Sequence, residues 1–500
     1  MSLAIVYARA KLGIDAPLVT VEVHLSNGLP AFNIVGLPET AVKESKDRVR
    51  SAIINSHFEF PSRRITINLA PADLPKEGGR FDLSIALGIL AASKQIPVET
   101  LDQYEFLGEL ALTGAIRPVQ GSLPAAIKCV EAGRALVIPV ENGSEATLCG
   151  SGTVLCARNL LQLCAHLHQR ECLSAEKFGS FKNIRSKYPD LNEVRGQLQA
   201  KRALEISASG GHNILFCGPP GTGKTMLASR LPGILPPLTQ QEMLEVATVH
   251  SLSNTPSQNF FQRPFRNPHH TASAVALVGG GSHPKPGEIS LAHHGILFLD
   301  ELPEFQRQVL EVLREPLESG EIMISRATQQ VRFPASFQLV AAMNPCPCGY
   351  YGDDKRACRC TPDRIRRYRD KISGPLLDRI DMQLNVGRLP ANLLRERSNN
   401  IETSGQVLER VTRTRAKQLG RGGKTNAALS VKELEIFCIL DSDNHNLLEK
   451  TVNRLDLSPR AYHRILRVAR TIADMEEQDA ITSKHLMEAT GYRTLERQNT

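Results

Sequence analysis

The stretch Gly218–Thr225, GPPGTGKT, matches the G-x-x-x-x-G-K-[ST] template of a phosphate-binding loop. It follows the apolar run HNILFC and precedes TMLASRL, so the sequence predicts a strand, the loop and then a helix. In this geometry Lys224 places a cation at the β- and γ-phosphates of ATP, and the Thr225 hydroxyl binds Mg²⁺. The residues expected to bind the nucleotide are Gly218, Pro219, Pro220, Gly221, Thr222, Gly223, Lys224 and Thr225.

Two more apolar runs end in polar residues that suit ATP hydrolysis. In GILFLDEL the apolar run is followed by Asp300 and Glu301, and in FQLVAAMN it is followed by Asn344. Because ligands bind at the carboxyl ends of parallel strands, these side chains are expected beside the phosphates. Asp300 would bind Mg²⁺, Glu301 would act as general base on the attacking water, and Asn344 would contact the γ-phosphate or orient that water.

Length and composition indicate a multidomain protein without a membrane span. The chain has 500 residues, of which 41% are hydrophobic and 22% charged, as in soluble globular proteins. No window approaches the length of a transmembrane helix, and the N-terminus does not resemble a secretory signal, so we expect a cytoplasmic protein. We predict an α+β domain over 1–165, a linker over 166–189, an α/β core with a parallel sheet over 190–390, and a small helical domain over 391–500.

The segment ISGPLLDRID places Arg379 between two acidic residues. One interpretation is a surface salt bridge of small energetic value. The other is an arginine finger that reaches the γ-phosphate bound by a neighbouring subunit.

Four cysteines follow Asn344 closely, at positions 346, 348, 358 and 360. Four thiolates suit tetrahedral Zn²⁺, and the residues between the two pairs are free to turn back, so we favour a zinc-binding insert over 345–361. A redox disulfide is the alternative, which a reducing compartment disfavours.

Basic residues crowd the same region, which favours contact with nucleic acid. Lysines and arginines neutralise phosphates, and the nearby Tyr350, Tyr351 and Tyr368 are of a type that stacks on exposed bases. The alternative is a solvated basic helix that packs on another subunit. Arg326, at the bend of the predicted two-stranded hairpin GEIMISRATQQVRFPA, would contact a phosphate or face solvent. The proposed DNA-binding residues are Arg326, Lys355, Arg356, Arg364, Arg366 and Arg367.

Together with the loop and ILFLDE, the segments AAMNPCPCG, KISGPLLDRID and LSPRAYHRILRVARTIAD resemble the ComM/YifB family. These are bacterial AAA+ proteins related to magnesium-chelatase motor subunits and MCM helicases. The resemblance implies a homo-hexameric ring that hydrolyses ATP between subunits and translocates DNA, promoting branch migration during natural transformation. It also implies that Arg379 is the finger acting across the interface, that Arg460 is the sensor-2 arginine, and that 391–500 is the helical lid. Lys371 stands where the family often has arginine.

The first domain resembles the Lon-protease fold in the segments INLAPADLPKEGGRFDLSIALGILAA and LGELALTGAIRPVQGSLPAAIKCVEAG. Arg80 stands where a Lon protease has its nucleophilic serine, and Pro124 stands where it has its lysine. Without hydroxyl and amine there is no activated nucleophile, so this domain is predicted to be non-proteolytic. Ser84, one helical turn further on, is interpreted as a packing residue.

Two other functions remain open at this point. One is a chelatase-type motor that remodels a protein partner without touching DNA. The other is a non-enzymatic binding module built on a Lon-like fold. The basic cysteine insert favours a DNA motor over the first, and the intact phosphate site argues against the second.

Overall fold

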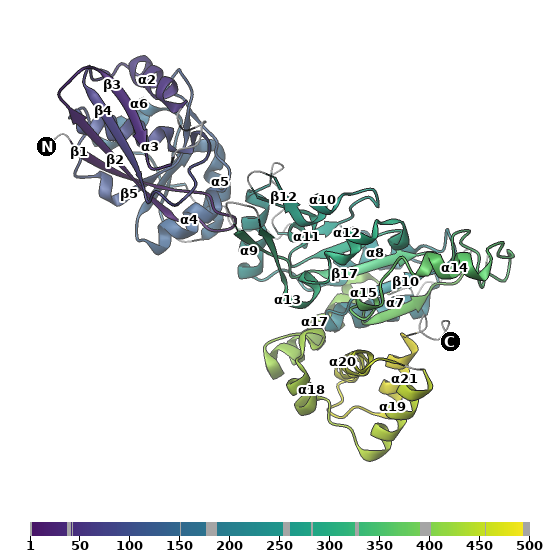
Figure 1. Cartoon of the computed structure of the whole chain (residues 1–500). Helices are drawn as coiled ribbons and strands as arrows, with labels where there is room; N and C mark the ends of the chain where they lie inside the picture. Colours follow the sequence, from purple (N-terminus) through teal and green to yellow (C-terminus); the bar gives the residue numbers. More distant parts are fainter. Residues whose placement is uncertain are drawn as a thin grey trace. The chain divides into compact units, whose positions relative to one another are not determined.

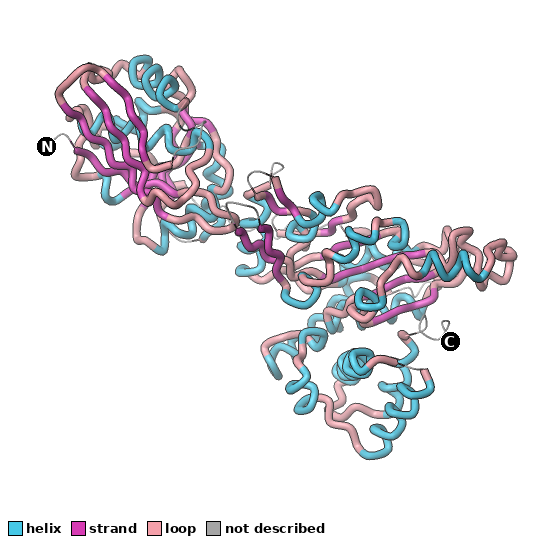
Figure 2. Tube along the Cα trace, in the orientation of Figure 1, coloured by secondary structure: helices cyan, strands magenta, loops and turns pink. Residues whose placement is uncertain are grey.

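The computed structural model describes residues 3–37, 42, 44–150, 152–176, 188–253, 261–281, 284–325, 330–390, 402–455 and 457–493. The chain divides into two compact units. The first comprises Met1–Asn183 with Met243–Phe260 and Ser325–Phe333, and the second comprises Ile184–Glu242, Phe261–Ile324 and Pro334–Thr500. Figures 1 and 2 show the elements of each unit.

A mixed sheet with the order β3-β4-β2-β1-β5-β8-β9 forms the centre of the first unit. Its strands are β1 (Leu3–Arg9), β2 (Leu18–Ser26), β3 (Ala31–Val35), β4 (Arg64–Ala70), β5 (Tyr104–Phe106), β8 (Ala135–Pro139) and β9 (Val154–Ala157). The short strands β6 (Glu109–Leu110) and β7 (Ile116–Arg117) pair separately. Its helices are α2 (Ser45–Asn55), α3 (Asp82–Ala92), α4 (Ser122–Glu131), α5 (Gly143–Ala146) and α6 (Leu160–Leu167).

Helix α3 explains why this unit has a well-developed core. Every residue of α3 is buried, and the helix packs against β1 and β2. The strands supply the matching face by period-two alternation: Val19, Val21 and Val23 of β2 are all fully buried. An apolar helix on an alternating sheet is the expected result for the segments that the sequence marks as helical and extended.

The region predicted as a linker is structured at its start. Helix α6 continues to Leu167, and Ala175 forms a bridge to Leu155 of β9. The backbone N–H of Glu176 donates to Val154 O at 2.8 Å. Residues 166–176 therefore belong with the first unit, and residues 177–187 lie outside the described part of the chain.

The second unit is built on a parallel sheet with the order β11-β14-β17-β10-β18. The strands are β10 (Ile214–Cys217), β11 (Phe265–Arg266), β14 (Ile296–Leu299), β17 (Gln338–Met343) and β18 (Met382–Asn385). Strands β10, β14 and β17 are buried at every residue, as is typical of a parallel sheet covered by helices on both faces. The predicted fold class, a parallel α/β core with a helical C-terminal region, is confirmed.

The chain between residues 198 and 377 also forms short helices and two-stranded ribbons; Met243–Phe260 and Ser325–Phe333 of this stretch belong to the first unit. The helices are α7 (Leu198–Gly210), α8 (Lys224–Arg230), α9 (Gln240–Ser251), α10 (Ala274–Val278), α11 (Glu288–Leu291), α12 (Arg307–Glu311), α13 (Pro316–Ser319), α14 (Pro362–Arg369) and α15 (Gly374–Leu377). Strands β12 (Gly279–Gly280) and β13 (Lys285–Pro286) form one ribbon, and β15 (Glu321–Ser325) and β16 (Gln330–Pro334) form another. The latter is the predicted hairpin; its bend, with Arg326, lies outside the described residues.

The C-terminal region is helical. Its helices are α17 (Ser404–Gly422), α18 (Val431–Phe437), α19 (Ser442–Arg454), α20 (Pro459–Met475) and α21 (Ser483–Gly491). Capping boxes at Thr403 and Ser430 start α17 and α18. The buried face of α20, with Ile465, Ala469 and Ile472, joins the same apolar core as β10 and β18. The described residues of this helical region thus share one apolar core with the sheet.

Candidate nucleotide site and cysteine insert

The phosphate-binding loop joins β10 to α8 and needs glycine at two positions. Gly221 and Gly223 have φ of +77° and +87°, in the left-handed region that side chains disfavour. A Cβ added at either glycine would meet nothing within 4 Å. The glycines are therefore required by backbone conformation and not by lack of space, which is what a loop that turns its amides inward demands.

Lys224, the first residue of α8, extends its ammonium back over this loop. Its Nζ donates to Gly218 O at 2.7 Å, to Pro219 O at 3.0 Å and to Asn344 Oδ1 at 3.1 Å. The side chain is 9% exposed, and this burial lowers the pKa of the Lys224 ammonium below its usual value. The cation is thus held by three oxygens at the place where phosphate oxygens of a nucleotide would replace them.

The residues expected to hold Mg²⁺ lie next to each other. The Thr225 hydroxyl donates to Asp300 Oδ2 at 2.7 Å, which joins the start of α8 to the end of β14. A hydroxyl and a carboxylate are the hard oxygen ligands that Mg²⁺ prefers. The donor set therefore fits this ion.

Strand pairing brings the acidic pair and the asparagine to one edge. In the parallel ladder Leu299 of β14 lies opposite Ala341 of β17, so the residues after both strands emerge at the carboxyl edge. There they line a cavity of about 370 Å³ together with the loop. The predicted site residues that line this cavity are Pro220, Gly221, Thr222, Gly223, Lys224, Thr225, Asp300, Glu301 and Asn344.

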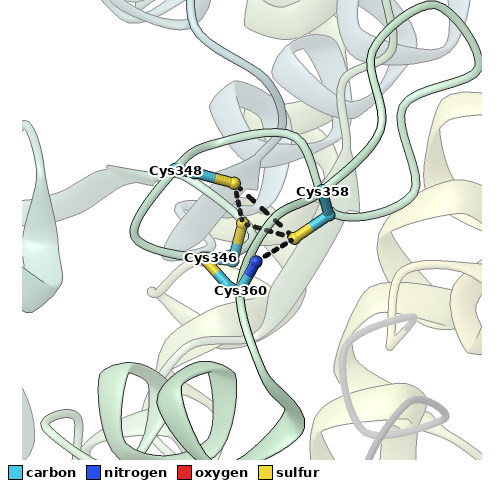
Figure 3. A group of neighbouring side chains, drawn as sticks. All are labelled: Cys346, Cys348, Cys358 and Cys360. Carbon is cyan, nitrogen blue, oxygen red and sulfur yellow. Dashed lines mark hydrogen bonds between the residues drawn. The ribbon is translucent and has the colours of Figure 1, made fainter.

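The four cysteines of the insert form a compact cluster, shown in Figure 3. Cys346 Sγ lies 3.4 Å from Cys348 Sγ, and each of these sulfurs lies 3.6 Å from Cys358 Sγ. All four sulfurs lie within 4.8 Å of one another. Four sulfurs at about 2.3 Å from one zinc ion would lie about 3.8 Å apart, whereas a disulfide requires about 2.05 Å. The cluster therefore fits zinc, and all four thiols are free cysteines.

Backbone amides stabilise the thiolate form of one of the four cysteines, Cys348. N–H groups of Arg359 and Tyr350 point at the Cys348 sulfur and lower the pKa of this thiol to about 6. Cys346, which follows Asn344 by two residues, is fully buried. Gly349, with φ of +84°, lies so close to the phosphate loop that an added Cβ would be 2.8 Å from Pro220 Cδ. The cysteine cluster thus packs directly against the nucleotide site.

Helix α14 presents the predicted DNA-contacting arginines to solvent. Arg364, Arg366 and Arg367 are exposed, while Ile365 and Tyr368 form the buried side of the helix. Burial raises the pKa of the Tyr368 phenol above its usual value. The expectation that Tyr368 stacks on bases is wrong, because the helical period turns it toward the protein.

The turn before α14 carries the other basic residues. Lys355 and Arg356 are exposed. The Arg356 guanidinium donates to the Tyr350 hydroxyl at 2.8 Å and lies 5.2 Å from the ring centroid, and Arg388 lies 5.6 Å from the same ring. Tyr351 is 44% exposed, and the Arg369 guanidinium lies 5.4 Å from its ring centroid, so arginines lie over both rings.

Arg379 lies at the opposite edge of the sheet from the phosphate loop. It follows α15 and precedes β18, whereas the loop follows β10, which is parallel to β18. The guanidinium is 6% exposed; it donates to Arg314 O at 3.1 Å and to Pro375 O at 2.7 Å, and pairs with Glu318 at 2.5 Å. A four-residue strand spans about 13 Å, so Arg379 is out of reach of its own chain's phosphate site.

Arg460 lines a second cavity at that same amino edge. The cavity, of about 630 Å³, is bounded by Asn213, Phe337 and Asp381, which directly precede β10, β17 and β18. Arg460, near the start of α20, is exposed. The structure therefore separates the predicted catalytic residues into one group at the carboxyl edge and the two arginines at the amino edge.

An ion-pair network behind this cavity was missed from the sequence. Asp381 pairs with Arg464 and lies 3.7 Å from His212 Nδ1. Burial alone would raise the pKa of Asp381, but the charges of Arg464 and His212 hold it well below its usual range. Asp381 and Arg464 are far apart in the chain, and they meet because α20 packs on α7, which in turn packs on β18.

In the first unit the two positions predicted to lack protease chemistry are both buried. Arg80 is 6% exposed, and burial lowers the pKa of its guanidinium to about 10. Pro124 is buried in α4. The Ser84 hydroxyl donates to Phe106 O at 2.8 Å inside the core, as suits a packing residue.

Comparison with known proteins assigns the family. The model "Magnesium chelatase, subunit ChlI" matches residues 190–394, "Subunit ChlI of Mg-chelatase" matches 21–142, and "Magnesium chelatase, subunit ChlI C-terminal" matches 401–493. The chain is 54% identical to Competence protein ComM of Haemophilus influenzae, over 99% of this chain and 98% of that one. The chain belongs to the ComM/YifB family of magnesium-chelatase-like AAA+ proteins.

More distant relatives agree with this assignment. The YifB protein of Salmonella typhimurium is 52% identical, over 99% of this chain and 98% of its own. The magnesium-chelatase 38 kDa subunit of Cereibacter sphaeroides is 27% identical over 30% of this chain and 51% of its own. Membership of this family indicates an ATPase. Among the described residues, no helix combines the length and apolar character that crossing a bilayer requires.

Proposed function

We propose that this protein is an ATP-driven DNA translocase that works as a homo-hexameric ring in the cytoplasm and promotes branch migration of recombination intermediates during natural transformation. The observation that carries the proposal is the division of the catalytic set between two edges of one sheet. Lys224, Asp300 and Glu301 line the carboxyl edge, and Arg379 and Arg460 lie at the amino edge. A site completed only by a neighbour's arginines needs a head-to-tail interface, and repetition of that interface closes a ring.

Each residue then has a defined task in hydrolysis. Lys224 binds the β- and γ-phosphates, and Asn344 and Glu301 orient the water. Glu301 accepts a proton as the water oxygen bonds to the γ-phosphorus, while the bond to the β-γ bridging oxygen breaks, giving ADP and inorganic phosphate. Mg²⁺, when held by Thr225 and Asp300, neutralises charge on the phosphates. Arg379 and Arg460 of the adjacent subunit would stabilise the charge that develops on the transferred group.

The cysteine insert supports DNA as the substrate. Helix α14, which follows the insert directly, exposes Arg364, Arg366 and Arg367, and the chain as a whole has a net charge of +8. Zinc held by Cys346, Cys348, Cys358 and Cys360 would stiffen this segment. We further propose that the first unit is non-proteolytic, because neither Arg80 nor Pro124 supplies a nucleophile or a base.

The decisive experiment is ATP-dependent unwinding of forked and three-stranded DNA, with Lys224→Ala as the inactive control. We expect ATPase activity that rises on addition of DNA and a substrate that is unwound only with ATP. Reversing charge with Arg364→Glu and Arg367→Glu should weaken DNA binding, whereas Arg454→Glu, on α19 away from the insert, should not. An ATPase rate indifferent to DNA would instead support a chelatase-type motor that remodels a protein, which the matches to chelatase models also allow.

A further inference from the structure

Helix α14 has two sides that face different surroundings. Its exposed side carries Arg364, Arg366 and Arg367, which are proposed to contact DNA, and its buried side carries Ile365 and Tyr368. No step of the proposed mechanism uses the buried side. The contacts of this side show what a ligand bound to the arginines would influence.

The buried side of α14 contacts the residues that follow β17. Tyr368 is 5% exposed, and the backbone N–H of Asn344 points at its hydroxyl. One residue further along each segment, the Arg369 guanidinium donates to Pro345 O at 3.4 Å. The end of α14 is therefore held against Asn344, the residue expected to contact the γ-phosphate or orient the water.

The turn after α14 contacts the segment that follows β14. Lys371 Nζ lies 3.5 Å from a carboxylate oxygen of Glu304 and 5.8 Å from the centroid of the Tyr368 ring. Glu304 ends the short 3-10 helix that begins at Leu302, directly after Glu301. One end of α14 thus contacts both of the segments that carry the water-orienting residues.

Helix α14 is too short and too highly charged to be stable by itself. It has eight residues, fewer than an isolated helix needs in water. Arg364 and Arg367 are three positions apart on its exposed side, and like charges at this spacing destabilise a helix. A polyanion bound to these arginines removes the repulsion and so favours the helical, docked form of the segment.

We propose that α14 couples DNA binding to ATP hydrolysis: DNA phosphates on its exposed arginines stabilise the docked helix, and Tyr368 then holds Asn344 in position to act on the attacking water. The inference rests on the proposed function and adds the route by which DNA raises the ATPase rate. Tyr368 does not line the phosphate cavity, so it is a positioning residue that acts through Asn344.

The test measures steady-state ATP hydrolysis with and without single-stranded DNA, and the Kd for that DNA, in wild type, Tyr368→Phe and the matched control Tyr492→Phe. DNA should raise the wild-type kcat at least about fivefold, the lower end of coupling between sites in proteins. Tyr368→Phe should keep the kcat without DNA and the Kd for DNA within about twofold of wild type, but DNA should raise its kcat less than about twofold. Tyr492→Phe removes the hydroxyl of another buried tyrosine, which contacts Glu488, and should respond to DNA as wild type does.

A double mutant separates positioning of Asn344 from a general effect on the fold. If Tyr368 acts through Asn344, adding Tyr368→Phe to Asn344→Ala should not lower the kcat measured with DNA any further. The inference alone would be overturned by an additive loss, by a full DNA response in Tyr368→Phe, by equal losses of kcat with and without DNA, or by weaker DNA binding of this variant. A wild-type ATPase rate indifferent to DNA would overturn the proposed function and the inference with it.

Discussion

The two edges of the parallel sheet differ in what their polar side chains contact. At the carboxyl edge the site residues contact one another: Lys224 donates to Asn344, and Thr225 donates to Asp300. At the amino edge Arg379 is held by Glu318 and by backbone oxygens, and Arg460 is exposed beside a polar cavity. The carboxyl edge thus forms a nearly complete phosphate site. The amino edge carries two arginines that are too far from that site to contact a phosphate bound there. A catalytic site shared between two copies requires this difference, because one copy would supply the phosphate site and the other the arginines.

The largest expected effect comes from the carboxyl edge. Lys224→Ala should reduce ATP turnover to the background rate and weaken nucleotide binding, because it removes the cation that contacts the phosphates. The measurements are phosphate release and binding of a fluorescent ATP analogue. Lys450→Ala, an exposed lysine on α19, is the matched control and should be unaffected. Normal turnover in Lys224→Ala would mean that the phosphate site lies elsewhere.

Next in size is the amino edge. Arg379→Ala should lower kcat by about 10³–10⁵ without weakening ATP binding, if Arg379 stabilises the transition state in a neighbouring subunit. Single-turnover hydrolysis and a binding titration measure the two effects. Equal loss of binding and turnover would show that Arg379 supports the fold of its own chain.

Mixing the two inactive variants tests directly whether the edges meet. In a random mixture of Lys224→Ala and Arg379→Ala subunits, about a quarter of interfaces would combine an intact pocket with an intact finger. Part of the activity should therefore return, although each variant alone is inactive. A mixture that stays inactive after subunit exchange would argue that both residues serve the same chain.

A smaller effect is expected for Arg460→Ala. Its loss should lower kcat by about 10²-fold, since it removes one donor to the developing charge. Steady-state kinetics with Arg454→Ala as control measure this change. No change in kcat would place Arg460 outside the catalytic set and leave Arg379 as its one member at this edge.

The smallest effect on hydrolysis is expected from the cysteine insert. Cys358→Ser should lower zinc from about one ion per chain to nearly none and reduce thermal stability, because three sulfurs do not close a structural site. Elemental analysis and thermal unfolding measure both, with Cys172→Ser, an exposed cysteine outside the cluster, as control. Absence of zinc from wild type and variant alike would remove the metal from the proposal.

Much of the site was predictable because its signals are local. A phosphate loop, acids at a strand end and paired cysteines are each defined by residues adjacent in the chain, and the structure brings each set together as their spacing predicts. The same local logic failed for Tyr368, whose side chain is buried by the turn of α14 although its neighbours in sequence are exposed arginines.

What sequence alone determined is which chemical groups come together: the Lys224 cation, the hydroxyl and carboxylates of Thr225, Asp300 and Glu301, and four thiols, because these need only residue type and spacing. What only the tertiary structure decided is which edge each group occupies and which distant residue it meets. The contact of His270 with Glu301 depends on how the segments after β11 and β14 pack, and that of Asp381 with Arg464 depends on the packing of a helix from the C-terminal region. Register and packing are set by the burial of many side chains at once, so no single segment of the chain encodes them.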